Sequence, residues 1–265
     1  MYLCYFYLCY LKREICALDL KEFFATYPKV ALGFSGGVDS SYLLYAAKKY
    51  GADIKPYYVK GKLQAEFELQ DAMDVAKFVG ADNMTILHVD PLEDERVVAI
   101  DAMRCYYCKC NVFGAIKEQA AKDGYDVIID GTNASDDLND RTGSIALREM
   151  KVLSPLRMSG ITKTAIRLLS KEAGLMTWDK PAYACLATRI PTGMPVTEEL
   201  LEKVEKAESE LMSLGYRDFR VRVLGNAAKL QLKPEQMAKL MGERYLVLYV
   251  LEQYFDEVYL DLKDR

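Results

Sequence analysis

Short apolar runs alternate with helical patterns along the first two thirds of the chain. Strands are predicted at residues 30–34, 54–59, 84–89, 125–129 and 151–153. Helices are predicted at residues 38–50, 63–79 and 161–173, with a further cysteine-bearing helix before residue 125. Strands that alternate with helices are typical of a parallel sheet with helical crossovers. We therefore predict an α/β fold built on a parallel sheet.

The pattern changes at about residue 175. Residues 175–195 hold three prolines, the only tryptophan and little periodicity. A long irregular stretch of this kind in a compact enzyme is more often functional than idle. From residue 197 a new unit follows, with a helix to about residue 214, strands near 219–223 and 229–232, a second helix, and a last strand near 258–260.

These changes divide the chain into three predicted parts. Residues 1–20 form an N-terminal extension, residues 21–195 the main α/β domain, and residues 196–265 a small α/β domain. A unit of roughly 70 residues lies in the size range where a neighbouring domain or subunit adds needed stability. We therefore assign the last part to substrate binding or oligomerisation, and we expect a homo-oligomer.

Composition narrows the class of protein. The net charge of -4 gives no electrostatic reason to expect a nucleic acid or an anionic membrane as partner. The apolar run at residues 1–11 is too short to span a bilayer and lacks the basic start of a secretory signal. The seven cysteines are an odd number in a chain of this length, which favours reduced thiols in the cytoplasm.

The segment around Ser35-Gly36-Gly37 carries the strongest chemical signal, because it joins a predicted strand directly to a predicted helix. Two glycines allow a sharp turn and a close approach to a ligand. The N–H groups and the dipole of the following helix suit a phosphate group. The loop lacks the lysine of a Walker motif. Asp39 in the first helical turn could hold Mg²⁺ on a pyrophosphate, or it could merely stabilise the helix.

A second loop, Asp130-Gly131-Thr132-Asn133, follows a later strand. Ligands of open α/β sheets gather beyond the carboxyl ends of the strands. This position favours a loop that faces the same ligand, and a plain glycine turn is the alternative.

The cysteines form a third signal. Cys105 and Cys108 are three residues apart, so both can face one centre on a helix or a turn. This spacing alone leaves a redox pair, half a zinc site and chance open. Cys185 lies in the irregular stretch, and Arg189 follows four residues later. We expect that positive charge to lower the pKa of the Cys185 thiol.

The sequence from Ser35 to Ser40 resembles the pyrophosphate loop of the N-type ATP pyrophosphatases, the PP-loop superfamily. The resemblance implies a Rossmann-like PP-loop domain that cleaves ATP between its α and β phosphates and adenylylates a substrate. It implies ATP contacts from Phe34, Ser35, Gly36, Gly37, Asp39, Ser40, Gly131, Thr132 and Asn133.

Several further motifs resemble the LarE family of ATP-dependent sulfur transferases, which act in the biosynthesis of the nickel-pincer nucleotide cofactor. They are Asp130-Gly-Thr-Asn-Ala, Ser154-Pro-Leu, Gly160-Ile-Thr-Lys, Trp178-Asp-Lys-Pro, Ala184-Cys-Leu-Ala-Thr-Arg and Arg220-Val-Arg. The resemblance implies a nucleotide substrate, a pyridinium dicarboxylate mononucleotide. Each carboxylate would be adenylylated and converted to a thiocarboxylate, with AMP and pyrophosphate as by-products.

Two versions of the sulfur chemistry occur in that family. In one, a cysteine at the position of Cys185 gives up its own sulfur. In the other, three cysteines hold a 4Fe-4S cluster whose open corner carries sulfide. The resemblance places Cys105, Cys108 and Cys185 at these ligand positions and favours the cluster. It makes Cys185 and Asp39 catalytic residues, and it leaves the source of the sulfide open.

Arg220 and Arg222 alternate along one predicted strand, so both side chains lie on the same face. A solvated face is one interpretation, and recognition of a phosphate or carboxylate is the other. The resemblance favours substrate contacts from Arg189, Arg220, Arg222 and Glu208, although Glu208 could equally be an exposed helix charge. His88 is predicted to be structural.

Two other functions stay open at this point. A tRNA-thiolating PP-loop enzyme would use the same activation, but residues 196–265 hold 11 Lys/Arg and 14 Asp/Glu, a net charge of -3. A nucleic-acid enzyme is expected to present a basic face. A metal-binding regulator that only senses ATP is the third possibility, and the complete loop with Asp39 argues against it.

Overall fold

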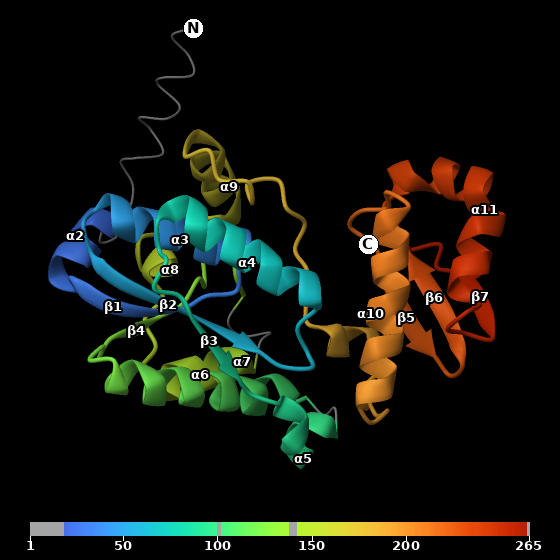
Figure 1. Cartoon of the computed structure of the whole chain (residues 1–265), viewed down its shortest axis with the longest axis horizontal. Coiled ribbons are helices and arrows are strands. Elements are labelled where there is room, and N and C mark those ends of the chain that lie inside the picture. Colours follow the sequence, from blue (N-terminus) through green and yellow to red (C-terminus); the bar gives the residue numbers. More distant parts are fainter. Residues whose placement is uncertain (1–18, 100–101, 138–141, 264–265) are drawn as a thin grey trace, which may run out of the picture.

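A four-stranded parallel sheet forms the centre of the larger part of the molecule (Figure 1). The computed structural model describes residues 19–99, 102–137 and 142–263. The strand order is β3-β2-β1-β4, with β1 at Lys29–Gly33, β2 at Asp53–Lys60, β3 at Thr85–His88 and β4 at Ile128–Ile129. Leu153 adds a parallel bridge to Ile129. The prediction of an α/β fold with a parallel sheet is confirmed.

Helices cover both faces of this sheet (Figure 1). One face carries α2 (Leu20–Thr26), α3 (Val38–Lys49), α4 (Glu66–Val79), α8 (Pro155–Met158) and α9 (Lys163–Glu172). The other carries α6 (Arg104–Lys122) and α7 (Gly143–Glu149). The division follows from the two-residue period of β1, because successive side chains point to opposite faces. Val30 and Leu32 pack with the α3 side, whereas Ala31 packs with α6.

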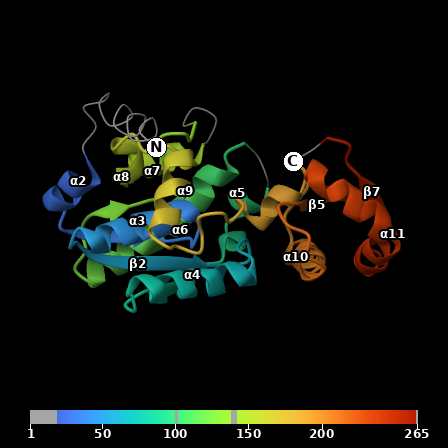
Figure 2. The ribbon, with the colours of Figure 1, turned by 90° about the horizontal axis from the view of Figure 1, so that it is seen from above.

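A second, three-stranded sheet lies at the other end of the molecule (Figure 2). Its order is β5-β6-β7, with β5 at Arg220–Leu224, β6 at Ala227–Gln231 and β7 at Glu257–Leu260. Helices α10 (Glu198–Ser213) and α11 (Met237–Leu251) pack on it. Thr197 accepts the N–H of Leu200 and so caps α10.

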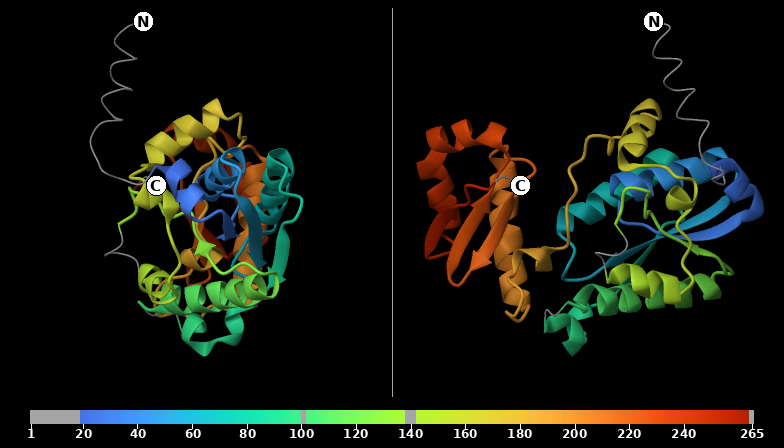
Figure 3. Two further views of the ribbon diagram at one scale, coloured as in Figure 1. Left: turned by 90° about the vertical axis from the view of Figure 1, so that its left-hand side faces the viewer. Right: turned by 180° about the vertical axis from the view of Figure 1, so that it is seen from behind.

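The two ends are joined by the irregular stretch that the sequence singles out, seen from behind in Figure 3. The one helical element within residues 175–195 is η2, a 3-10 turn at Leu186–Arg189. Three other short helical elements lie outside this stretch: η1 (Pro91–Glu93), α5 (Glu95–Val98) and η3 (Pro234–Gln236). Leu63, Val97 and Leu186 share one buried core with α10 and β5. The N–H of Leu186 donates to the carbonyl of Leu63 over 3.0 Å. A site on this stretch can therefore draw residues from both ends.

The structure differs from the predictions mainly in short elements. The helix predicted at 63–79 begins at Glu66, because Leu63 turns into the core shared with α10. Only two residues of 125–129 pair as a strand, and 151–153 contributes a single bridge. Helices α2, α5, α7 and α8 were not expected, because helices of four to seven residues depend on packing.

Some predictions are not tested by the fold. The segment 1–18, with Cys4, Cys9 and Cys16, lies outside the described residues. The limits of the three parts, the homo-oligomer and the cytoplasmic location stay predictions. None of the helices within 19–99, 102–137 and 142–263 is long and apolar enough to cross a membrane.

Candidate active site

The Ser35-Gly36-Gly37 loop leaves the end of β1 and enters α3 at once. Gly36 has a φ of +68°, and a Cβ atom there would lie 2.8 Å from the Cα of Ala72 on α4. A side chain would therefore be both strained and blocked at Gly36. The loop fits between the sheet and α4 only because this residue is glycine.

Hydroxyl groups hold the loop closed. The Oγ atoms of Ser35 and Ser40 lie 3.1 Å apart, and the Ser35 N–H donates to the Ser40 Oγ over 3.3 Å. The Ser40 hydroxyl donates to the carbonyl of Gly37 over 3.3 Å. Gly37 is the N-cap of α3 and offers no side-chain cap, so the N–H groups of the first turn keep their capacity to bind an anion.

The second predicted loop lies directly against the first turn of α3. A Cβ atom on Gly131 would lie 3.0 Å from the backbone nitrogen of Ser40. The buried Asn133 donates from Nδ2 to Asp39 Oδ1 over 3.4 Å. Asp130 accepts the hydroxyls of Thr132 and Ser154 over 2.5 and 2.6 Å, which fixes the loop. The structure thus brings the two predicted nucleotide loops together.

Lys163 completes this cluster and was missed as a site residue. Its Nζ lies 2.5 Å from Asp39 Oδ2, and both side chains keep part of their surface exposed. Lys163 is the first residue of α9, whose N-cap Thr162 accepts the N–H of Ala165. The sequence signal that could have identified Lys163 is the Gly160-Ile-Thr-Lys motif, which ends at this residue. Lys163 thus places a positive charge beside the loop from another helix, whereas a Walker loop contains its own lysine.

The three predicted sulfur ligands lie near one another. Cys105 and Cys108 are in the first two turns of α6, and Cys185 directly precedes η2. Arg104 bridges these elements, since its Nη1 donates to the carbonyl of Ala187 over 3.1 Å and its Nη2 lies 3.9 Å from the Cys105 sulfur. Within the described ranges, no three Cys, His, Asp or Glu side chains already have the arrangement of a metal site.

Burial favours the neutral form of two of the three thiols, Cys108 and Cys185. Burial raises the pKa of Cys108 to about 11, and the neighbouring cysteines Cys185 and Cys105 contribute to the rise. Burial also raises the pKa of Cys185. Arg189 lowers the pKa of Cys185 as expected, and Arg104 lowers it more. The loss of hydration outweighs both charges, so the pKa is raised overall.

Arg189 is instead paired with Glu208. The Arg189 Nε and Nη2 donate to the two carboxylate oxygens of Glu208 over 3.0 and 2.8 Å. Both side chains are 0% exposed. The interpretation of Glu208 as an exposed helix charge is therefore wrong. Substrate contact by Arg189 or Glu208 is not tested by this burial and stays a prediction.

Arg220 and Arg222 extend from β5 to the irregular stretch. Arg220 is 5% exposed and donates to the carbonyls of Phe219 and Ala182 over 2.6 and 2.7 Å. Arg222 is half-buried and donates to the carbonyl of Thr188 over 2.5 Å. A solvated face is therefore wrong for Arg220. Burial, and next the charge of Arg189, lower the pKa of Arg220 to about 10.

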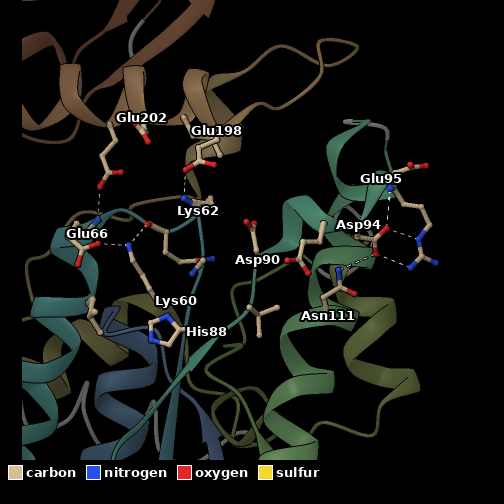
Figure 4. Close-up of a pocket in the computed structure, with 18 residues that line it drawn as sticks. Lys60, Lys62, Glu66, His88, Asp90, Asp94, Glu95, Asn111, Glu198 and Glu202 are labelled. Carbon is tan, nitrogen blue, oxygen red and sulfur yellow. Dashed lines mark hydrogen bonds and ion pairs between the residues drawn. The ribbon is translucent and has the colours of Figure 1, made fainter.

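A cleft of about 1410 Å³ opens beyond the carboxyl ends of β2 and β3 (Figure 4). Lys60 pairs with Glu66 over 2.8 Å on one wall, and Lys62 pairs with Glu198 of α10. Arg96 and Asn111 both donate to Asp94 on the opposite wall. Leu63, which accepts the N–H of Leu186, lies between two lining residues in the sequence but does not itself line the cleft. The predicted cysteine ligands and the residues of the two predicted nucleotide loops do not line this cleft either.

Glu68 on α4 gives a pH-dependent prediction. Burial raises its pKa from 4.5 to about 7, although Lys180 and Arg189 oppose the rise. Folded protein then binds more protons at Glu68 than unfolded protein between these values, so stability is lost as pH rises through this window. We expect Glu68→Gln to match wild type at pH 5 and to exceed its free energy of unfolding at pH 8 by about 1–3 kcal/mol. Urea titrations of both proteins at pH 5 and pH 8 measure these free energies of unfolding. The same difference between variant and wild type at both pH values would contradict the prediction.

A strand that runs into a glycine loop, an uncapped helix start, and Asp39 beside Lys163 together define a PP-loop enzyme that uses ATP. No family model matches the sequence. The chain is 31% identical to the pyridinium-3,5-bisthiocarboxylic acid mononucleotide synthase of Lactiplantibacillus plantarum, over 77% of this chain and 74% of that protein. The chain belongs to the family of this synthase, the LarE family.

Two other relatives frame this assignment. An uncharacterised protein of Synechocystis is 34% identical over 85% of this chain and 84% of its own length. A tRNA-specific 2-thiouridylase of Thermotoga petrophila is 25% identical over 56% of this chain and 52% of its own length. Thiolation of tRNA is thus the activity of a more distant relative.

Proposed function

We propose that this protein is an ATP-dependent sulfurtransferase that acts on a pyridinium dicarboxylate mononucleotide. It adenylylates a carboxylate with release of pyrophosphate, and it converts the acyl adenylate to a thiocarboxylate with release of AMP. The observation that carries the proposal is the start of α3, which has no side-chain cap and where Asp39 contacts Asn133 and Lys163. The identity with the synthase of Lactiplantibacillus plantarum supports the choice of substrate.

The activation step uses the two loops. Residues of the two loops hold the phosphates and the nucleoside of ATP. These residues are Phe34, Ser35, Gly36, Gly37, Ser40, Gly131, Thr132 and Asn133. A substrate carboxylate oxygen attacks the α phosphorus, and the bond to the β-phosphate oxygen breaks. The departing pyrophosphate carries away the electron pair and the negative charge. Asp39 would hold Mg²⁺, which when bound would stabilise the charge of the pyrophosphate, and Lys163 neutralises further charge.

The second step replaces oxygen by sulfur. A sulfur nucleophile attacks the activated acyl carbon, and the bond from this carbon to the adenylate oxygen breaks. Cys105, Cys108 and Cys185 would hold a 4Fe-4S cluster, which when bound would supply sulfide at the iron that lacks a protein ligand. The donor set supports this assignment, because three thiols converge from α6 and the start of η2. Ligation requires the loss of their protons.

A sacrificial Cys185 is the second candidate for the sulfur source. Its support is that Cys185 is half-buried beside η2, with a neutral thiol that Arg104 and Arg189 can help to ionise. In that case, after acyl transfer, a base removes the Cα proton of Cys185 and the Cβ–S bond breaks. The electron pair of that bond leaves with the thiocarboxylate sulfur, and a dehydroalanine remains.

A direct assay tests the proposed function. Protein isolated without oxygen is incubated with ATP, Mg²⁺, sulfide and the pyridinium dicarboxylate mononucleotide. We expect pyrophosphate and AMP to appear only with the mononucleotide, and mass spectrometry to find the thiocarboxylate. A parallel reaction with unmodified tRNA should give neither pyrophosphate nor thiouridine. Pyrophosphate release with tRNA, and none with the mononucleotide, would support the tRNA-thiolating alternative instead.

Arg222 is our candidate for the substrate phosphate, with Arg220 beside it. Arg222 keeps part of its surface exposed at the irregular stretch. We expect Arg222→Lys to raise the KM for the mononucleotide by roughly tenfold, because an ammonium cannot reproduce the bidentate fork of a guanidinium. The KM for ATP should stay unchanged. Steady-state pyrophosphate release measures both constants, and an unchanged mononucleotide KM would remove Arg222 from the substrate site.

A further inference from the structure

Arginines hold the backbone of the segment that carries Cys185. Residues 182–185 belong to no helix or strand, and only the short turn η2 follows. Four carbonyls accept arginine donors: Ala182 from Arg220 over 2.7 Å, Ala184 and Cys185 from Arg189 over 2.5 and 3.2 Å, and Thr188 from Arg222 over 2.5 Å. The guanidinium groups thus satisfy backbone carbonyls that a neighbouring strand would satisfy in a sheet.

Arg189 is in turn fixed by Glu208 of α10. Glu208 accepts four hydrogen bonds: Arg189 Nε over 3.0 Å, Arg189 Nη2 over 2.8 Å, the Tyr183 hydroxyl over 2.6 Å and the Val221 N–H over 2.9 Å. The Tyr183 ring lies against the Arg189 guanidinium, 4.4 Å from its centroid. A buried pair of this kind is costly to break, since the remaining charge is left unpaired in the interior.

The opposite side of the segment is held by α6. Arg104, the residue before Cys105, donates to the carbonyl of Ala187. Cys185 therefore lies between two anchors, one on the helix that bears the other thiols and one on α10 and β5. Its position relative to Cys105 and Cys108 depends on both.

We propose that Glu208, Arg189 and Tyr183 are positioning residues that fix the Cys185 segment for sulfur transfer and do not contact the substrate. The inference rests on the proposed function. Arg189 and Glu208 have no exposed side-chain surface, which favours a role that acts through their neighbours. Their charges and hydrogen bonds act on Cys185 through the backbone of residues 183–189. Loss of this anchor should loosen the segment and leave the ATP loop intact.

The test compares Glu208→Gln and Tyr183→Phe with Glu202→Gln, a matched control on the same helix. Glu202 is exposed, lies at the wall of the cleft away from the Cys185 segment, and pairs with Lys206 over 3.1 Å. Metal-free protein is treated with iodoacetamide at one fixed pH, and alkylation of each cysteine is followed by peptide mass spectrometry. The rates of pyrophosphate release and thiocarboxylate formation are measured on the same variants.

We expect alkylation of Cys185 to accelerate by roughly tenfold or more in Tyr183→Phe and Glu208→Gln, because a charge-assisted hydrogen bond in this anchor is lost. Alkylation of the exposed Cys105 should not change, nor should that of any cysteine in Glu202→Gln. Thiocarboxylate formation should fall by a similar factor, with pyrophosphate release and the mononucleotide KM retained.

The outcomes separate the two proposals. Unchanged Cys185 alkylation in folded Tyr183→Phe protein, with a raised mononucleotide KM, would overturn the positioning role and make these residues substrate contacts. If Glu208→Gln does not fold, Tyr183→Phe still decides, since it removes one hydroxyl and keeps the ring. If wild type releases no pyrophosphate with the mononucleotide, the proposed function fails, and the alkylation rates still judge the anchor.

Discussion

Cys185→Ala protein should release pyrophosphate in the presence of the mononucleotide at close to the wild-type rate and form no thiocarboxylate. Both proposed sulfur sources require this thiol, whereas the ATP loop lies on β1 and α3. Cys185 is only half-buried, so removing its sulfur should cost little stability. Pyrophosphate release and product mass, measured on the same sample, check the expectation. Thiocarboxylate formation by Cys185→Ala would exclude Cys185 from both schemes.

Cys105→Ala and Cys108→Ala separate the two sulfur sources. With a cluster, each should lose colour and product formation to the same extent as Cys185→Ala, because three ligands act together. Cys110→Ala is the matched control, a thiol on the same helix that we assign no role. It should retain iron, sulfide and activity.

The mass of the protein after turnover gives an independent answer. A cluster that is reloaded leaves Cys185 intact over several turnovers when sulfide is supplied. A sacrificial cysteine acts once and leaves dehydroalanine. Dehydroalanine at position 185, or full activity in Cys105→Ala, would therefore show that Cys185 is itself the donor.

The nucleotide loop could be predicted from sequence because its determinants are local. A strand, the residues Ser35-Gly36-Gly37 and a helix start follow one another within a few positions. The positive φ at Gly36 is what such a glycine pair signals. The second loop was also predictable, since it ends a neighbouring strand of the same sheet. The meeting of Lys163 with Asp39, 124 positions apart, follows only from how α9 packs on α3.

The anchor around Cys185 could not be predicted, because burial of charge leaves no local pattern. Glu208 stands on an amphipathic helix among other acidic residues, where a solvated position is the ordinary expectation. Its partner Arg189 lies on an irregular stretch without periodicity. Nearness of Arg189 to Cys185 in sequence suggested an ionised thiol. In the structure the Arg189 guanidinium pairs with Glu208 and also donates to the backbone of the Cys185 segment. Burial of the thiol outweighs the charge of Arg189, so the pKa of Cys185 is raised.

Asp39→Ala should lower mononucleotide-dependent pyrophosphate release by roughly 10²–10³-fold, the usual cost of losing one group that stabilises charge in a transition state. The variant loses the proposed Mg²⁺ ligand. It also loses the ion pair in which Lys163 Nζ lies 2.5 Å from Asp39 Oδ2. Its stability should fall by only about 0.3–1 kcal/mol, because an acid in the first turn of α3 stabilises the helix dipole.

Asp39→Asn is the matched control for shape, since it keeps an oxygen near Asn133 and removes the charge. We expect it to be nearly as slow as Asp39→Ala if the charge holds Mg²⁺, and a Mg²⁺ titration should show a raised metal requirement in both. Lys163→Ala separates the metal from the ion pair. If Asp39 serves only to orient Lys163, the double variant will be no slower than Lys163→Ala and the Mg²⁺ requirement will not change. Wild-type release by folded Asp39→Ala would remove the start of α3 from the activation step.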